Sequence, residues 1–199
     1  MKNPKKILII IQRSNGDVLL SQALINNLYE YYKSPKIDLL VNDDTLSIAR
    51  LLSNINFIHL FSYKKKRENR WQQEKEIIAS IYRKYDLSIN LTASDRSVLY
   101  TFFASKNSIS TIEKDNNKSW WKKSLLNHHY FFDSTRHILL NNLEPLHFLK
   151  IKHTNILGKP KVSEVSIAKI KSKLLKKGIK DFIIFHPSAQ YNYKIYPQH

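Results

Sequence analysis

Short apolar runs alternate with amphipathic stretches along the first three quarters of the chain. Residues 7–11 form a continuous, β-branched-rich apolar run, which predicts a parallel strand buried on both faces. Residues 14–17 then carry turn and capping chemistry. A helix is expected directly afterwards, because apolar positions recur at helical spacing at Leu20, Leu24, Leu28 and Tyr31. The sequence therefore predicts a βα corner of the kind at which open α/β sheets bind ligands.

The same alternation continues to residue 149 and predicts a parallel sheet built from βαβ units with right-handed crossovers. Further strands are expected at residues 37–41, 55–61, 86–91 and 107–112. Helices are expected after a cap at residues 43–45 and at residues 67–85, 94–104 and 137–149. Residues 113–134 lose the pattern and are expected to form a loop with one short helix at most.

Particular positions refine these expectations. Trp71, Ile78 and Ile81 are predicted to share the buried side of their helix. Pro145 should kink or split the helix at residues 137–149, because proline lacks the N–H that a helix interior requires.

The last part of the chain changes character. Residues 162–177 predict a basic amphipathic helix ended by Gly178, and residues 181–186 predict a strand. Because Gly158 and Pro160 interrupt the pattern, we expect two domains, at residues 1–157 and 158–199.

Composition limits the classes of function. The chain has 199 residues and no cysteine, which excludes disulfides and thiolate metal sites. No apolar run approaches the roughly 20 residues that span a bilayer, so a soluble protein is expected. The net charge of +17, from 33 Lys and Arg against 16 Asp and Glu, indicates a polyanionic partner or a negatively charged surface. Nucleic acid and an acidic glycolipid both fit this charge, and so does a solvated surface without a partner.

Four stretches of the sequence resemble one enzyme family. Residues 12–20, Gln-Arg-Ser-Asn-Gly-Asp-Val-Leu-Leu, resemble the opening motif of glycosyltransferase family 9, the bacterial lipopolysaccharide core heptosyltransferases. Residues 37–41, 85–96 and 186–197 resemble later motifs of that family, in the family's order. Together with Arg136 and His137 ahead of a helix, these stretches resemble most the heptosyltransferase III branch, which adds the third, side-branch heptose.

The resemblance implies a fold and an activity. It covers the first half of a family member and implies a Rossmann-like acceptor domain of a GT-B glycosyltransferase, an α/β parallel sheet with flanking helices, with the second domain incomplete. The implied reaction is inverting transfer of heptose from ADP-heptose to the inner core of lipopolysaccharide, without cofactor or metal. The implied location is cytoplasmic, peripheral at the inner membrane. Residues 1–199 alone are expected to transfer no sugar, since a nucleotide-sugar needs an enclosed pocket.

Two other classes of function stay open beside the enzyme. One is an inactive truncated remnant that only binds acidic glycolipid. The other is a basic nucleic-acid-binding protein, which is disfavoured because the sequence contains no recognised module of that kind.

By resemblance, Asp17 is the catalytic base. The acceptor hydroxyl must lose its proton as it attacks the anomeric carbon, and a carboxylate within hydrogen-bonding reach can take that proton. Closure of the cleft is expected to remove water from Asp17. Without the family, Asp17 is more simply a helix cap that favours the helix dipole.

Donor-binding residues are proposed in two places. Ser14 and Gly16 can present backbone N–H groups to an anion at the start of the first helix, although a plain turn explains them equally. Ser188 and Lys194 are implied to contact the donor phosphate and the nucleotide-sugar. Tyr196 replaces the family's usual tryptophan, and Ala189 lacks a hydroxyl that some members place there.

Acceptor-binding residues are expected to be cationic, since the inner core carries phosphates and carboxylates. The candidates are Lys64, Lys65, Lys66, Arg67, Arg96, Arg136 and His137. The alternatives are a solvated charge run for residues 64–67 and an ion pair with Asp95 for Arg96. No metal site is predicted from His128 and His129, because adjacent histidines without suitably spaced carboxylates are weak evidence.

Overall fold

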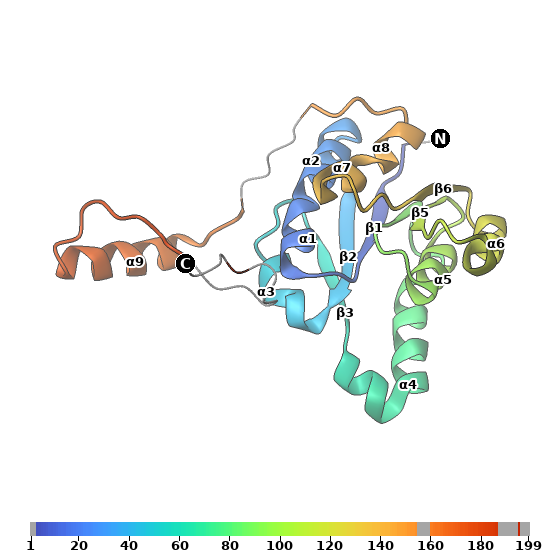
Figure 1. Ribbon diagram of the computed structural model, residues 1–199, viewed down its shortest axis with the longest axis horizontal. Helices are drawn as coiled ribbons and strands as arrows, with labels where there is room; N and C mark the ends of the chain where they lie inside the picture. The colour runs from blue at the N-terminus through green and yellow to red at the C-terminus, as the bar shows by residue number, and fades with distance from the viewer. Residues whose placement is uncertain (1–2, 155–159, 187–194, 196–199) are drawn as a thin grey trace. The chain divides into compact units, whose positions relative to one another are not determined.

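The computed structural model describes residues 3–154, 160–186 and 195 (Figure 1). The chain divides into two compact units, Met1–Lys161 and Val162–His199.

Within the described part of the first unit, six parallel strands form one sheet in the order β3-β2-β1-β4-β5-β6. The strands are β1 (Lys6–Ile11), β2 (Lys36–Asn42), β3 (Phe57–Phe61), β4 (Leu87–Asn90), β5 (Ser108–Ile112) and β6 (His128–Phe131). This arrangement confirms the predicted α/β, Rossmann-like fold. The strand order reverses between β1 and β4, which places the expected ligand crevice at the carboxyl ends of these two strands.

Helices pack on both faces of the sheet (Figure 1). They are α1 (Asn15–Leu20), α2 (Gln22–Tyr31), η1 (Asp43–Thr45), α3 (Leu46–Ala49), α4 (Tyr63–Ile81), α5 (Asp95–Ala104), α6 (Asn116–Leu125), α7 (Ile138–Leu143) and α8 (Pro145–Phe148). Ile7, Ile9 and Ile11 pack into a core with α2 and the α7–α8 region. Leu8 and Ile10 face the opposite way, toward buried residues of α4 and α5. Because β1 is buried on both faces, every position from Ile7 to Ile11 is apolar.

Two predicted helices are divided in the structure. The helix expected after β1 is split at Ser21, whose hydroxyl donates to the Val18 carbonyl at 2.7 Å and competes with the helical ladder. The helix expected at residues 137–149 is split at Pro145, which begins α8, so the predicted effect of this proline is confirmed.

The prediction that Trp71 faces inward is wrong. The backbone of α4 is non-helical at Asn69, with φ −150° and ψ 75°, and this break resets the helical phase. Gln73, Ile77 and Ile81 are buried, whereas Trp71 is 76% exposed.

Two strand predictions are also corrected. Residues 128–131 form β6, where a loop was expected, because the polar pair His128 and His129 hides the apolar signal. Residues 181–186, a strand by their sequence pattern, were expected to lack sheet partners within residues 1–199; no strand forms there, and the apolar side chains are exposed. An extended segment needs a neighbouring strand for its backbone hydrogen bonds, and the described residues offer it none.

The second unit contains α9 (Glu164–Lys176), which begins at the cap Ser163. Gly178 follows with φ 63°, and its N–H donates to the Leu175 carbonyl at 3.0 Å. The predicted glycine at the end of this helix is therefore confirmed.

Candidate active site

The carboxyl ends of β1 and β4 are tied together where the strand order reverses. The backbone N–H of Gln12, just after β1, donates to Thr92 Oγ1, just after β4, at 2.9 Å. Asn90 Nδ2 donates to Ser97 Oγ at 3.1 Å and to Ser110 Oγ at 2.8 Å, which joins β4 to α5 and β5. These bonds give the two ligand-facing corners a fixed spacing.

Asp17 lies in the first turn of α1 at this edge, and the Arg13 side chain bonds one oxygen of its carboxylate. Its Oδ2 accepts from Arg13 Nε at 2.9 Å, and the Arg13 guanidinium lies 4.6 Å from the centre of the Phe132 ring. Within the described residues no hydrogen bond reaches Asp17 Oδ1. The carboxylate is thus oriented through one oxygen, while the other has no donor among the described residues.

The residues before Asp17 are open to solvent. Ser14 is the N-cap of α1 with extended backbone, but its side chain makes no capping bond. Gly16 is exposed, and a Cβ built there would meet nothing within 4 Å. Nothing in the described fold therefore requires a glycine at this position, and the space beside it can admit a ligand.

Polar atoms without partners gather at the same edge. Buried atoms of Gln12, Asn42 and Arg96 have no hydrogen-bond partner among the described residues: both amide atoms of Gln12, Asn42 Oδ1 and Arg96 Nε. Gln12 is 7% exposed and Asn42 is 5% exposed. Because buried polar groups are nearly always bonded, such orphaned atoms indicate a site completed by water or ligand.

The register of the sheet places the Gln12 and Asn42 side chains in one row. Each residue comes one position after the last register pair of β1 and β2, which is Ile11 with Val41. Asn42 in turn pairs with Phe61 of β3. Strand alternation places Gln12 and Asn42 on the face packed by α4 and α5. Neither amide was predicted as a site residue, although a polar residue at the end of a buried strand is a signal that the sequence shows.

Arg96 belongs to this row rather than to an ion pair with Asp95. Its guanidinium lies 3.6 Å from the centre of the Phe61 ring, a cation–π contact, and 5.6 Å from that of Tyr63. Asp95 instead bonds Lys122 Nζ at 2.6 Å, so the alternative of an Asp95–Arg96 pair is wrong.

The other proposed acceptor residues lie on different elements. Lys64, Lys65, Lys66 and Arg67 occupy the first turns of α4 and form no ion pair within the described residues. Arg136 pairs with Glu144 at 3.2 Å, and His137 caps α7 by accepting from the Leu139 N–H at 3.3 Å. The proposed donor residues Ser188 and Lys194 lie outside the described residues.

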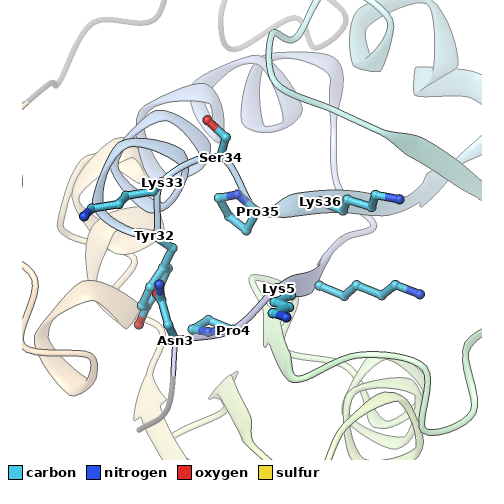
Figure 2. Close-up of a pocket in the computed structure, with 9 residues that line it drawn as sticks. Asn3, Pro4, Lys5, Tyr32, Lys33, Ser34, Pro35 and Lys36 are labelled. Atoms are coloured by element: carbon cyan, nitrogen blue, oxygen red, sulfur yellow. The ribbon is translucent and has the colours of Figure 1, made fainter.

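A cavity in the described part of the chain lies at the opposite, amino edge of the sheet. It measures about 530 Å³ and is lined by residues that include Lys5, Lys33 and Lys36. Figure 2 shows the side chains of Lys33 and Lys36 pointing away from each other. These two ammonium groups therefore do not converge on a common ligand in this cavity.

A second polar network lies beside that cavity. Tyr85 OH donates to Asp38 Oδ2 at 2.8 Å and lies 2.9 Å from His59 Nε2. Burial raises the pKa of Tyr85, aided by its bond to Asp38, while burial lowers the pKa of His59. Both effects favour the neutral forms, so this network is a structural link among β2, β3 and the start of β4.

In the described residues, no group of three or more histidines and carboxylates is close enough to bind a metal ion. None of the described helices combines the length and apolar character needed to cross a membrane.

Gln12→Met tests whether the orphaned amide serves a ligand. The substitution keeps the approximate shape and removes two unpaired polar atoms, so we expect the free energy of unfolding to rise by about 1 kcal/mol. If the amide serves a ligand, binding of that ligand should weaken at the same time. Chemical denaturation measures the first effect, and a transfer assay for the function proposed below measures the second.

The matched control is Gln73→Met. Gln73 is also buried, but both of its amide atoms bond Ser62, at 2.8 and 3.0 Å, so the same change should destabilise the protein by about 1–2 kcal/mol. An equal destabilisation by Gln12→Met would show that the Gln12 amide is structural.

Comparisons with known proteins support the fold. The chain is similar to the crystal structure of a glycosyl transferase family 9 protein from Veillonella parvula, with TM-score 0.76 and 19% identity over 97% of this chain and 56% of that one. It is similar to E. coli heptosyltransferase WaaC with ADP-2-deoxy-2-fluoro heptose, with TM-score 0.61 and 16% identity over 75% of this chain and 50% of that one. It is also similar to E. coli ADP-heptose lps heptosyltransferase II, with TM-score 0.62 and 16% identity over 88% and 51% of the two chains.

The chain thus spans about half the length of these solved structures. No family model matches the sequence, and no curated protein matches it. At 16–19% identity the likeness establishes a shared fold, that of the N-terminal domain of GT-B glycosyltransferases.

Proposed function

We propose that the protein is an inverting glycosyltransferase that moves a heptose from ADP-heptose to the inner core of lipopolysaccharide, with Asp17 as general base. The observation that carries the proposal is the Asp17 carboxylate, oriented by Arg13 through Oδ2 and open at Oδ1, beside the reversal of strand order. In such a transfer the acceptor oxygen attacks the anomeric carbon, the bond to the ADP phosphate breaks, and the hydroxyl proton passes to Asp17.

The remaining residues are assigned to the two substrates. Backbone N–H groups at Ser14 and Gly16 face the donor diphosphate, with Ser188 and Lys194 as the proposed contacts from the second domain. On the acceptor side, the amides of Gln12 and Asn42 suit sugar hydroxyls, because an amide both donates and accepts. Arg96, Arg136 and His137 complete this side as cationic or polar groups toward the inner core.

The finer assignment rests on sequence motifs and on the neighbours. Two structural neighbours are a heptosyltransferase with an ADP-sugar analogue and an ADP-heptose transferase, which supports a nucleotide-sugar donor here. The side-branch heptose as product and a peripheral position at the cytoplasmic face of the inner membrane are part of the proposal. The inactive remnant that only binds acidic glycolipid is the rival, and binding of nucleic acid is disfavoured.

The test is a transfer assay on the full-length protein with ADP-heptose and a purified inner-core acceptor. We expect ADP release and an acceptor mass increased by one heptose, with UDP-glucose and GDP-mannose as inactive control donors. Acceptor binding without product would favour the remnant. Product from a control donor at an equal rate would overturn ADP-heptose as the substrate.

A further inference from the structure

Residues 63–72 project from the first unit and are fixed at their base. The Ser62 N–H donates to Gln73 Oε1 at 2.8 Å, and Gln73 Nε2 donates to the Ser62 carbonyl at 3.0 Å. Between these residues the break at Asn69 turns the first part of α4 away from the rest of the helix (Figure 1). We call residues 63–72 the projection, and its closed base gives it a defined orientation on the domain.

The charge of the projection is strongly positive and spread in all directions. It contains Lys64, Lys65, Lys66, Arg67 and Arg70 against one carboxylate, that of Glu68. Successive helical residues are rotated by about 100°, so the four cations from residue 64 to residue 67 radiate around the helix axis. They cannot converge on one compact anion. Beside an extended negative surface, the cations on the near side can contact it and the others add to the attraction over about a Debye length.

A small cavity next to the projection is unsuited to binding an anion. The cavity beside the projection, about 220 Å³, is lined by Glu68 and Glu76 as well as Lys65. Two carboxylates in one small cavity disfavour a bound phosphate there. We therefore expect the positive side chains to bind a partner outside the domain.

The projection also carries exposed aromatic side chains. Trp71 is 76% exposed, and its ring lies 5.8 Å from the Arg70 guanidinium, while Tyr63 is exposed with Lys66 Nζ at 5.9 Å. Because Gln73, Ile77 and Ile81 occupy the inward face of α4, Trp71 points away from the core. Tryptophan and tyrosine flanked by cations are the residues enriched at the interface between a bilayer and water.

We propose that the projection docks the protein on an anionic phospholipid bilayer. Trp71 and Tyr63 enter the headgroup region, and the basic residues attract the charged lipids. The inference rests on the peripheral membrane position in the proposed function and deepens it by naming the surface that binds; vesicle binding can be tested without donor or acceptor.

The experiment measures binding of the protein to vesicles of phosphatidylcholine with and without 30% phosphatidylglycerol, by sedimentation at low and high salt. We expect binding only to the anionic vesicles, weakened by salt. Replacing Lys64, Lys65, Lys66 and Arg67 by glutamine should weaken it by about 100-fold or more. Trp71→Ala should weaken it by about tenfold. Bromine-labelled lipid should quench the wild-type fluorescence more than that of Trp71→Phe.

Two matched controls separate this surface from general effects of charge and hydrophobicity. Replacing Lys33, Lys36, Lys106 and Lys152 by glutamine removes the same charge from other exposed positions. Trp120→Ala removes a tryptophan that is 67% exposed on α6. If either control weakened vesicle binding as much as its counterpart in the projection, the proposal would be wrong. Loss of duplex DNA binding in the projection variants, with no binding to vesicles, would identify a nucleic-acid surface instead.

A second arm rests on the proposed function. Neutralising residues 64–67 should raise the KM for a lipid-linked acceptor in anionic vesicles and leave the KM for its deacylated, water-soluble form unchanged. An equal rise for both forms would assign these residues to the acceptor's sugars and overturn their role at the bilayer. The vesicle measurements keep their meaning even if no sugar is transferred.

Discussion

Replacing Asp17 with asparagine should lower the rate of sugar transfer roughly 10²- to 10⁴-fold, the usual loss when a general base is removed. Asparagine keeps the shape of the side chain, and its oxygen can still accept from Arg13, but the amide cannot take a proton. The kcat of the full-length protein, its calorimetric affinity for ADP-heptose and its thermal unfolding are the measurements. Only kcat should change substantially.

Arg13→Gln is the control for this experiment. If Asp17 served only to form the ion pair seen at 2.9 Å, loss of either partner would have the same effect. We expect the Arg13 variant to lose less than about tenfold in kcat, because the base itself is still present. Wild-type turnover by Asp17→Asn, or equal losses in both variants, would remove Asp17 from the reaction.

Replacing Lys122 with methionine should destabilise the first unit by about 2–3 kcal/mol. The Lys122 side chain is 0% exposed and bonds both Asp95 and Glu113, which joins α6 to the start of α5 and the end of β5. Burial alone lowers the pKa of Lys122, but its bonds to these carboxylates outweigh burial and raise that pKa. The partial exposure of both carboxylates keeps the expected loss below that of a fully buried pair.

Lys118→Met on the same helix is the comparison. Lys118 lies 3.7 Å from Asp115, and both side chains are exposed, so the loss should be below about 0.5 kcal/mol. Urea denaturation of the two variants measures the difference. Equal stabilities would mean that water replaces the Lys122 contacts at little cost.

The sequence predicted the sheet well because burial on both faces leaves a direct pattern. Ile7 to Ile11 read as a buried strand, and β1 is the strand flanked by β2 and β4 in the centre of the sheet. β6 was not predicted because two of its four residues are the polar His128 and His129, which leave no apolar run in the sequence. The strand forms through its pairing with β5. Short edge strands are chosen by tertiary pairing more than by their own composition.

Asp17 and Arg96 were proposed as site residues from the sequence, but the residues that surround them were not. The Arg13–Asp17 pair has i,i+4 spacing and could have been anticipated. The row formed by Gln12, Asn42 and Arg96 could not, because three separate corners of the fold meet there. Likewise, no local rule connects Lys122 to Asp95, which is 27 positions away along the chain.

The mutual hydrogen bonds of Ser62 and Gln73 have a consequence for how this protein can vary. These bonds hold the two ends of the projection together at one point of the domain. A change in the length of the projection should therefore leave the register of β3 and the packing of Ile77 and Ile81 unchanged. Doubling a closed loop adds only about 0.6 kcal/mol of closure entropy. Insertions, deletions or grafted sequences should therefore be accommodated here, so that the surface of the projection can change while the sheet and its core stay constant.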